Sequence, residues 1–331
     1  MGWYRCTRKF EKKLRGVSDR DHQASLSKTL AWLESPNHKL IHFGSSDYPE
    51  QLAQIPDPPL LLYAVGDLSL LSCPQLAIVG SRNPTQYGRR VTKLFAEEIA
   101  KSGIIVTSGM ARGIDSAAHR GALEVSCSTL AVLGTGCDLA YPRENRGLMS
   151  EISNSGLILS EFPPGTGPAA TNFPQRNRIV TGLSCGTVVI EARMRSGSLI
   201  SARLAMEQGR CVFAVPGSVL SKQSEGCHHL LKEGARLTAG VADIIEELSM
   251  SYPELRFLAK DTREDVFSRL GEREQRILKL LDLEPMGIEK ISEIMGIPVN
   301  ETLQSLVGIE LSGFVVSSAG SYQLCADWKH N

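Results

Sequence analysis

Residues 104–115 read Ile-Ile-Val-Thr-Ser-Gly-Met-Ala-Arg-Gly-Ile-Asp, and this stretch decides the fold. An apolar run over 104–107 leads into a glycine-rich turn, and an amphipathic helical pattern follows over 114–125. Short apolar runs bounded by turn residues predict buried strands, whereas apolar side chains three or four residues apart predict helices. The stretch therefore predicts a strand, a tight loop and a helix that packs back against a sheet.

The same alternation repeats between residues 60 and 234. Strands that alternate with crossover helices predict an α/β protein with an extended Rossmann-like, doubly wound, mostly parallel sheet and helices on both faces. Such sheets bind ligands beyond the carboxyl ends of their strands, where helix amino termini point. The other predicted strands are 60–65, 76–80, 129–133, 157–160, 187–191 and 211–215, and the other predicted helices are 87–102, 144–155, 175–183, 198–208 and 224–234.

Prolines and polar stretches divide the 331-residue chain into parts. Three short helical patterns and a Gly-containing hairpin end the chain, and this order predicts a winged-helix domain after the sheet. The third of these helices, over 299–311, contains no lysine or arginine, so we interpret the domain as a protein-contact or regulatory module. The predicted domains are an N-terminal helical segment at 1–58, the Rossmann-like domain at 59–248, a linker at 249–268 and the winged helix at 269–328.

Composition limits the class of protein further. The apolar runs are too short to cross a bilayer, and no apolar stretch follows the basic first twenty residues, so we expect a cytoplasmic protein. The eight cysteines lack metal-site spacing and are interpreted as free thiols, which predicts no metal and no cofactor. The net charge is zero, but residues 61–244 carry a net charge of +4 and residues 245–331 a net charge of −6. Any phosphate-binding surface should therefore lie in the middle of the chain.

Five loops place glycines, small hydroxyls or an arginine where a strand ends or a helix begins. Backbone N–H groups at such loops approach phosphates closely, and an arginine adds a bidentate donor. The pattern matches neither the dinucleotide fingerprint nor the P-loop, and several loops suit the successive phosphates of a polymer better than one nucleotide. The loops are at 80–82, 108–115, 134–145, 161–178 and 195–198.

No nucleophile with a recognisable base indicates an enzyme, so we predict no catalytic residues. His119 is interpreted as a packing or capping residue. Asp115, Glu161 and Glu191 stay open between bracing the loops and serving as catalytic carboxylates. A rival hypothesis is a nucleotide N-glycosidic hydrolase of the lysine-decarboxylase-like group, because residues 185–187 with Glu191 are similar to its glycine-rich loop, although the glycine pair is missing.

Nine ordered motifs over residues 45–245 resemble the DNA-processing protein A family, also called Smf. They include GSR at 80–82, SGMARGID at 108–115, YPREN at 141–145, FPQRNRI at 173–179 and SGSLISAR at 196–203. Two departures stand out, namely a short, atypical version of the SAM-like N-terminal domain and the acidic winged helix. The residues that the resemblance and the loops together predict for DNA and phosphate binding are Gly80, Ser81, Arg82, Ser108, Gly109, Arg112, Gly134, Thr135, Gly136, Arg143, Phe173, Arg176, Asn177, Arg178, Ser196, Gly197 and Ser198.

The resemblance also implies a function. Members of the family bind single-stranded DNA without hydrolysing it, form homodimers, and load the RecA recombinase onto DNA that enters during natural transformation. The expected partners of this chain are therefore single-stranded DNA, RecA and a second copy of itself, with single-strand-binding protein as a further one. No membrane partner is expected.

Overall fold

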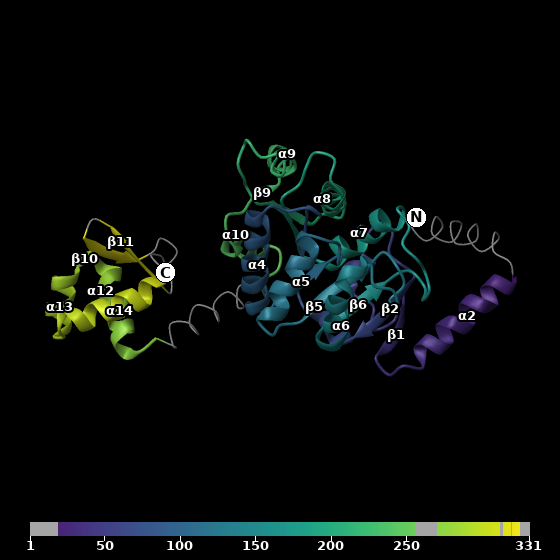
Figure 1. The fold of residues 1–331 in the computed structure, drawn as a ribbon, viewed down its shortest axis with the longest axis horizontal. Helices are drawn as coiled ribbons and strands as arrows, with labels where there is room; N and C mark the ends of the chain where they lie inside the picture. The colour runs from purple at the N-terminus through teal and green to yellow at the C-terminus, as the bar shows by residue number, and fades with distance from the viewer. Residues whose placement is uncertain (1–18, 254, 256–269, 312–313, 319, 325–331) are drawn as a thin grey trace. The chain divides into compact units, whose positions relative to one another are not determined.

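The computed structural model describes residues 19–253, 255, 270–311, 314–318 and 320–324 (Figure 1). The chain divides into two compact units, residues 1–259 and 260–331. The first unit contains a nine-stranded sheet and the second a three-stranded sheet.

The large sheet is mostly parallel, as the alternating pattern predicts. Its strand order is β1-β2-β6-β5-β4-β3-β7-β8-β9, in which β1 and β2 run antiparallel to their neighbours. The chain therefore builds outward from β3 in one direction and then returns to place β7 on the other side of β3, which makes β3 and β7 the switch point. The strands are β1 (His38–His42), β2 (Leu61–Gly66), β3 (Gln75–Gly80), β4 (Ile105–Ser108), β5 (Thr129–Leu133), β6 (Leu157–Ser160), β7 (Gly186–Ile190), β8 (Cys211–Ala214) and β9 (Arg236–Leu237).

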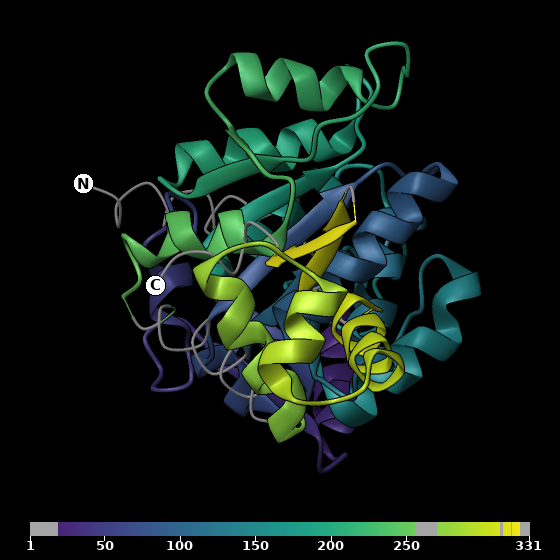
Figure 2. The same ribbon diagram turned by 90° about the vertical axis from the view of Figure 1, so that its left-hand side faces the viewer.

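Helices cover both faces of this sheet (Figure 2). Successive side chains of a strand point to opposite faces, and on β3 Ala77 and Val79 join one core cluster while Leu76 and Ile78 join another. One face packs against α3 (Glu50–Ala53), α7 (Asn172–Leu183), α8 (Gly197–Glu207) and α9 (Glu225–Lys232). The other face packs against α4 (Gln86–Lys101), α5 (Ile114–Glu124), α6 (Arg146–Ser155) and α10 (Val241–Ser249).

The predicted boundary at residue 58 does not separate two compact units. The helix α2 (Asp19–Leu33) is present, but β1 pairs with β2 as the outer strand of the sheet, and Leu52 is fully buried in the main core. The 3-10 helices η1 (Leu68–Ser72) and η2 (Arg143–Asn145) complete the unit. The prolines at 56–59 therefore mark a turn inside one domain, because the apolar side chains on both sides of them share one core.

The start of the predicted linker also belongs to the first unit, since Leu255 is buried in the core beside α10. Residues 256–268 of that linker lie outside the described residues. The second unit has the predicted winged-helix elements α12 (Glu272–Leu283), α13 (Ile288–Met295) and α14 (Val299–Leu311), with strands β10 (Met286–Gly287), β11 (Val315–Ser318) and β12 (Ser321–Leu324) around one apolar core. In the described ranges, no helix combines the length and the apolar character that crossing a membrane requires.

Replacing Leu52 by alanine should destabilise the first unit by about 2–5 kcal/mol, because a fully buried leucine leaves a cavity in the shared core. Leu26→Ala is the control, since Leu26 is 57% exposed and its loss should change the free energy of unfolding by less than about 0.5 kcal/mol. Urea unfolding measures both. Equal stability of the Leu52→Ala variant and the wild type would contradict the shared core.

Candidate functional site

A cavity of about 660 Å³ opens at the switch point of the sheet. The carboxyl end of β3, the loop after β4, the start of α7 and the β7–α8 connection form its walls. This is where doubly wound sheets bind ligands. The predicted site residues that line the cavity are Gly80, Ser81, Arg82, Gly109, Phe173, Arg176, Asn177, Ser196, Gly197 and Ser198.

Three exposed arginines give the cavity a positive charge. Arg82 follows β3, and Arg193 and Arg195 follow β7, so the two central strands present cations at the same edge. None of the three forms a salt bridge with a carboxylate of the described residues, whereas Arg112 and Arg178 both do. The guanidinium groups of Arg82, Arg193 and Arg195 are therefore available to an anionic ligand.

Two aromatic rings stand beside these cations. The ring centroids of Phe173 and Tyr141 are 5.4 Å apart, and the Arg82 guanidinium carbon lies 5.7 Å from the Phe173 centroid. Gly134 permits this arrangement, because a Cβ at that position would meet the Phe173 ring at 2.9 Å. The cavity thus combines charge with stackable surface, as sites for nucleic-acid strands do.

The amino terminus of α8 contributes small donors. The Ser196 hydroxyl caps the helix by accepting from the Ser198 N–H at 3.3 Å, and the two hydroxyls lie 2.6 Å apart. A Cβ on Gly197 would meet no atom within 4 Å, so the backbone there is open to a ligand. The helix dipole and the open backbone at Gly197 favour an anion at this position.

Arg176 lies beneath the cavity and is buried. Its guanidinium donates to the carbonyl oxygens of Gly109, after β4, and Val132, on β5. Burial lowers the pKa of Arg176 to about 10, so the side chain keeps its charge at neutral pH. Burial raises the pKa of Asp115, and the charge of Arg176 opposes that shift. Arg176 therefore holds strand ends together and supplies a cation to a buried acid.

The loop that carries Arg82 is braced by Glu191. The Ser81 N–H donates to the Glu191 carbonyl at 2.7 Å, and the Glu191 carboxylate accepts from the Thr85 N–H at 2.8 Å and from its hydroxyl. A Cβ on Gly88 would lie 2.4 Å from a Glu191 carboxylate oxygen, so glycine leaves room for the carboxylate in this position. Of the three carboxylates left open by the sequence, Glu191 braces the loop outside the cavity, Asp115 lines the cavity, and Glu161 pairs with Arg178.

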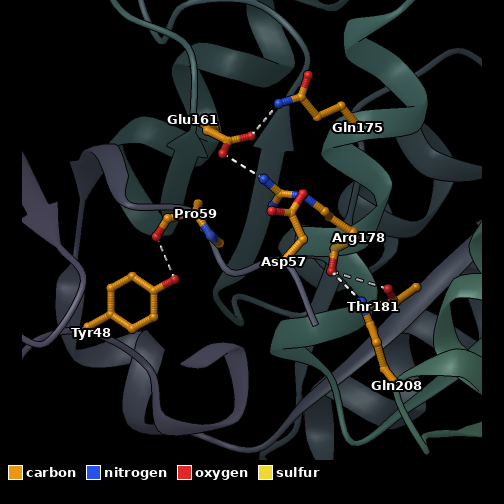
Figure 3. Close-up of polar contacts among 8 residues, drawn as sticks. All are labelled: Tyr48, Asp57, Pro59, Glu161, Gln175, Arg178, Thr181 and Gln208. Carbon is orange, nitrogen blue, oxygen red and sulfur yellow. Dashed lines mark hydrogen bonds and ion pairs between the residues drawn. The ribbon is translucent and has the colours of Figure 1, made fainter. Parts of the chain in front are cut away.

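Arg178, predicted as a phosphate contact, does not line this cavity. Its side chain is only 10% exposed and pairs with Glu161 at 2.6 Å and with Asp57 at 3.4 Å (Figure 3). Gln175 donates to the second Glu161 oxygen at 3.0 Å. Because Asp57 lies between β1 and β2, this network ties α7 to the connection between these two strands.

The other predicted residues outside the cavity have internal or peripheral positions. The Ser108 hydroxyl donates to the Ile78 carbonyl at 2.6 Å, and the Thr135 hydroxyl donates to the Leu139 carbonyl at 3.0 Å. The Gly136 N–H donates to the Thr166 carbonyl. Arg112 pairs with Glu144 at 2.5 Å on the surface, and Arg143 lines a different cavity.

The prediction missed Arg193, Tyr141 and Ile200 as lining residues. Arg193 could have been found by the signal that selected Arg82, since both are arginines directly after a central strand. The rival hydrolase loop is not a loop, because Gly186 and Thr187 lie within β7. Among the described side chains, no group of three metal-ligating residues occurs.

Comparisons with known proteins agree with this geometry. A family profile described as "DNA recombination-mediator protein A" matches residues 39–249, and one described as "DprA winged helix domain" matches residues 263–321. Protein Smf of Escherichia coli is 42% identical over 305 residues, which cover 90% of this chain and 80% of that protein. DNA processing protein DprA of Streptococcus pneumoniae is 46% identical over 200 residues, which cover 60% and 71%.

Two solved structures share the fold. The Streptococcus pneumoniae DprA structure has a TM-score of 0.65 at 42% identity and covers 72% of this chain and 81% of that one. A Helicobacter pylori DNA processing protein A, whose structure concerns single-stranded DNA binding, has a TM-score of 0.59 at 34% identity and covers 65% and 96%.

The doubly wound sheet and the cavity at its switch point define an α/β protein with a cationic cavity at the carboxyl ends of its central strands. The matched profiles and relatives make the assignment specific. The chain belongs to the DNA recombination-mediator protein A family, also known as DprA or Smf, as the motifs at residues 45–245 predict.

Replacing Arg176 by methionine should destabilise the protein by about 3–5 kcal/mol, because it leaves two buried carbonyl groups without their donor and Asp115 without its cation. The exposed Arg82→Met is the matched control and should change the free energy of unfolding by less than about 0.5 kcal/mol. Equal losses in urea unfolding of the two variants would contradict the structural role of Arg176.

His119 should make the protein sensitive to acid. The Thr129 hydroxyl lies 2.8 Å from His119 Nδ1 and donates to the Val106 carbonyl, so Nδ1 carries the proton of a neutral ring. Burial, with the charge of Arg176, lowers the His119 pKa to about 3, below its unfolded value of 6.5. The stability that the neutral ring contributes is therefore present above pH 6.5 and falls by about 1.4 kcal/mol per pH unit toward pH 3.

The test compares the pH dependence of unfolding in the wild type and in His119→Gln, which cannot titrate. Groups common to both proteins cancel in the difference, including Asp115, whose raised pKa acts in the opposite direction. As the pH falls below 6.5, the free energy of unfolding should decrease more steeply for the wild type than for His119→Gln. Parallel curves would contradict the buried neutral histidine.

Proposed function

We propose that this chain binds single-stranded DNA in the switch-point cavity and acts as a recombination mediator without cutting the strand. The observation that carries the proposal is a set of three arginines beside the Phe173–Tyr141 ring pair. These arginines, Arg82, Arg193 and Arg195, form no salt bridge with a carboxylate in the described part of the chain. Several cations along one cavity suit successive phosphates, and aromatic rings stack bases without sequence preference.

The proposed contacts follow from exposure. Arg82, Arg193 and Arg195 hold phosphates, Phe173 and Tyr141 stack bases, and the half-buried Asn177 and the α8 amino terminus donate hydrogen bonds. Arg112 and Arg143 are proposed as outer contacts, because both are exposed but lie outside this cavity. The remaining predicted residues shape the site from within, namely Gly80, Ser81, Ser108, Gly109, Gly134, Thr135, Gly136, Arg176 and Arg178.

The finer role follows from membership of the family. We propose that the protein protects incoming DNA and loads RecA onto it during natural transformation, that it works in the cytoplasm as a homodimer, and that single-strand-binding protein is a further partner. Absence of catalysis is part of the proposal. It is supported by the position of Glu191, whose carboxylate is bonded to Thr85 and does not line the cavity.

The winged helix is proposed to contact protein rather than DNA. Its third helix, α14, exposes Val299, Leu303 and Val307 at intervals of four residues, which places them on one face. Glu301 and Glu310 lie on the same helix. An apolar, acidic helix is poorly suited to a phosphate backbone.

The test titrates a labelled twenty-nucleotide oligo(dT) and a matched duplex over a salt series. The wild type should prefer the single strand, and Arg82→Ala should weaken binding about tenfold and flatten the salt dependence, because one phosphate contact is lost. The control is Arg120→Ala, since Arg120 is exposed on α5 away from the cavity and should not matter.

Three results would contradict the proposal: binding without salt dependence, preference for the duplex, or equal effects of Arg82→Ala and Arg120→Ala. Incubation with nucleoside monophosphates tests the hydrolase hypothesis in parallel. Release of free base would favour that hypothesis over the binding protein.

A further inference from the structure

A second cavity, of about 740 Å³, is lined by Arg143 and by residues that have no role in the proposed function. Its walls come from α2, β1, the loop 137–140, and the start of α6. Its lining includes aromatic and charged side chains, namely Trp32, His38, Asp138, Arg143 and Arg146.

The aromatic wall of this cavity is rigidly built. The rings of Trp32 and His38 stack with their centroids 4.2 Å apart and 23° between their planes, and the Trp32 ring also meets Tyr63 edge-on at 5.8 Å. His38 Nδ1 lies 2.7 Å from the Trp32 carbonyl oxygen, which holds the imidazole in place. Both stacked side chains are only half-buried, so part of this wall faces the cavity.

Arg143 and Arg146 supply the charge opposite that wall. Both are exposed, and neither forms a salt bridge with a carboxylate of the described residues. Asp138 also lines the cavity, but its carboxylate accepts from the Gly165 N–H at 2.9 Å and is held at the loop. The cavity therefore offers an aromatic surface and two available guanidinium groups, the same combination of groups as in the first cavity.

One segment of chain joins the two cavities. Asp138, Leu139 and Ala140 line the second, Tyr141 lines the first, and Arg143 lines the second again. A segment of six residues spans at most about 20 Å, so one extended strand of DNA can reach both cavities. The exposed rim residues Leu139 and Tyr141 lie between the cavities.

We propose that the second cavity is a subsite for the same strand of DNA, in which a base contacts the Trp32–His38 wall and phosphates contact Arg143 and Arg146. The strand leaves the first cavity over Tyr141 and enters the second within a few nucleotides. The inference rests on the proposed function. It adds a longer footprint and a second stacking position, with a role for Trp32 and Arg146 that the motifs of the family do not contain.

The test uses the full chain and two labelled probes, oligo(dT) of two and of twenty nucleotides. Arg146→Glu should weaken binding of the twenty-nucleotide probe about tenfold and lower its salt slope by about one phosphate contact, because a single strand loses roughly 0.7 units per contact. It should leave binding of the dinucleotide probe unchanged, because that probe is too short to occupy both cavities. Trp32→Ala should act in the same way, and Trp32→Phe should restore binding, because phenylalanine keeps a stackable face.

Arg120→Glu is the matched charge control, since Arg120 is an exposed arginine that lines neither cavity. Three outcomes overturn the inference while the proposed function stands: Arg146→Glu leaves both probes unchanged, it weakens both probes equally, or Arg120→Glu weakens the long probe as much. Failure of the wild type to bind either probe overturns the proposed function, and the inference falls with it. An unchanged urea transition verifies that the Arg146→Glu chain is folded. The Arg146→Glu result therefore tests the subsite even if Trp32→Ala weakens packing.

Discussion

The buried guanidinium of Arg176 is the interaction on which the rest of the site depends. It joins α7 to the carbonyl groups of Gly109 and Val132, and so it fixes a helix on one face of the sheet against two strand ends. A buried cation is stable only where acceptors and a counter-charge surround it, and this requirement allows one placement of α7. Phe173 and Asn177, four residues apart on that helix, then lie together at the cavity.

The residues of the motif at 173–178 have different structural roles, although they lie on one helix. Phe173 and Asn177 line the cavity, Arg176 lines it from a buried position where it donates to two carbonyl groups, and Arg178 pairs with Glu161 and Asp57. Each role follows from the direction in which the residue leaves the helix and from the charge it meets there. Two arginines in the same short motif therefore stabilise the fold, whereas the arginines left free for a ligand come from the ends of β3 and β7.

The two strands of the large sheet that the sequence did not predict, β1 and β9, share a physical cause. The strand β1 has exposed side chains at Lys39, Leu40 and His42 and a single buried residue, Ile41, so its pattern carries little apolar signal. The strand β9 has two residues, both exposed. Edge strands of this kind form because a neighbouring strand supplies backbone hydrogen-bond partners. The sequence of the edge strand alone does not show that such a neighbour exists. The seven strands whose apolar runs are buried were all predicted.

The sequence by itself determined the α/β class, the loops at the strand ends, the family and the acidic nature of the last domain, because apolar periodicity, glycine turns and ordered motifs are local properties of a chain. Only the tertiary structure decided which arginines are free. Arg82 and Arg178 look alike in the sequence, but the second meets Glu161 and Asp57, which precede it by 17 and 121 positions. Whether an arginine is paired depends on residues far away in the sequence that folding brings close to it. The presence or absence of such a partner separates a structural arginine from one that can hold a phosphate.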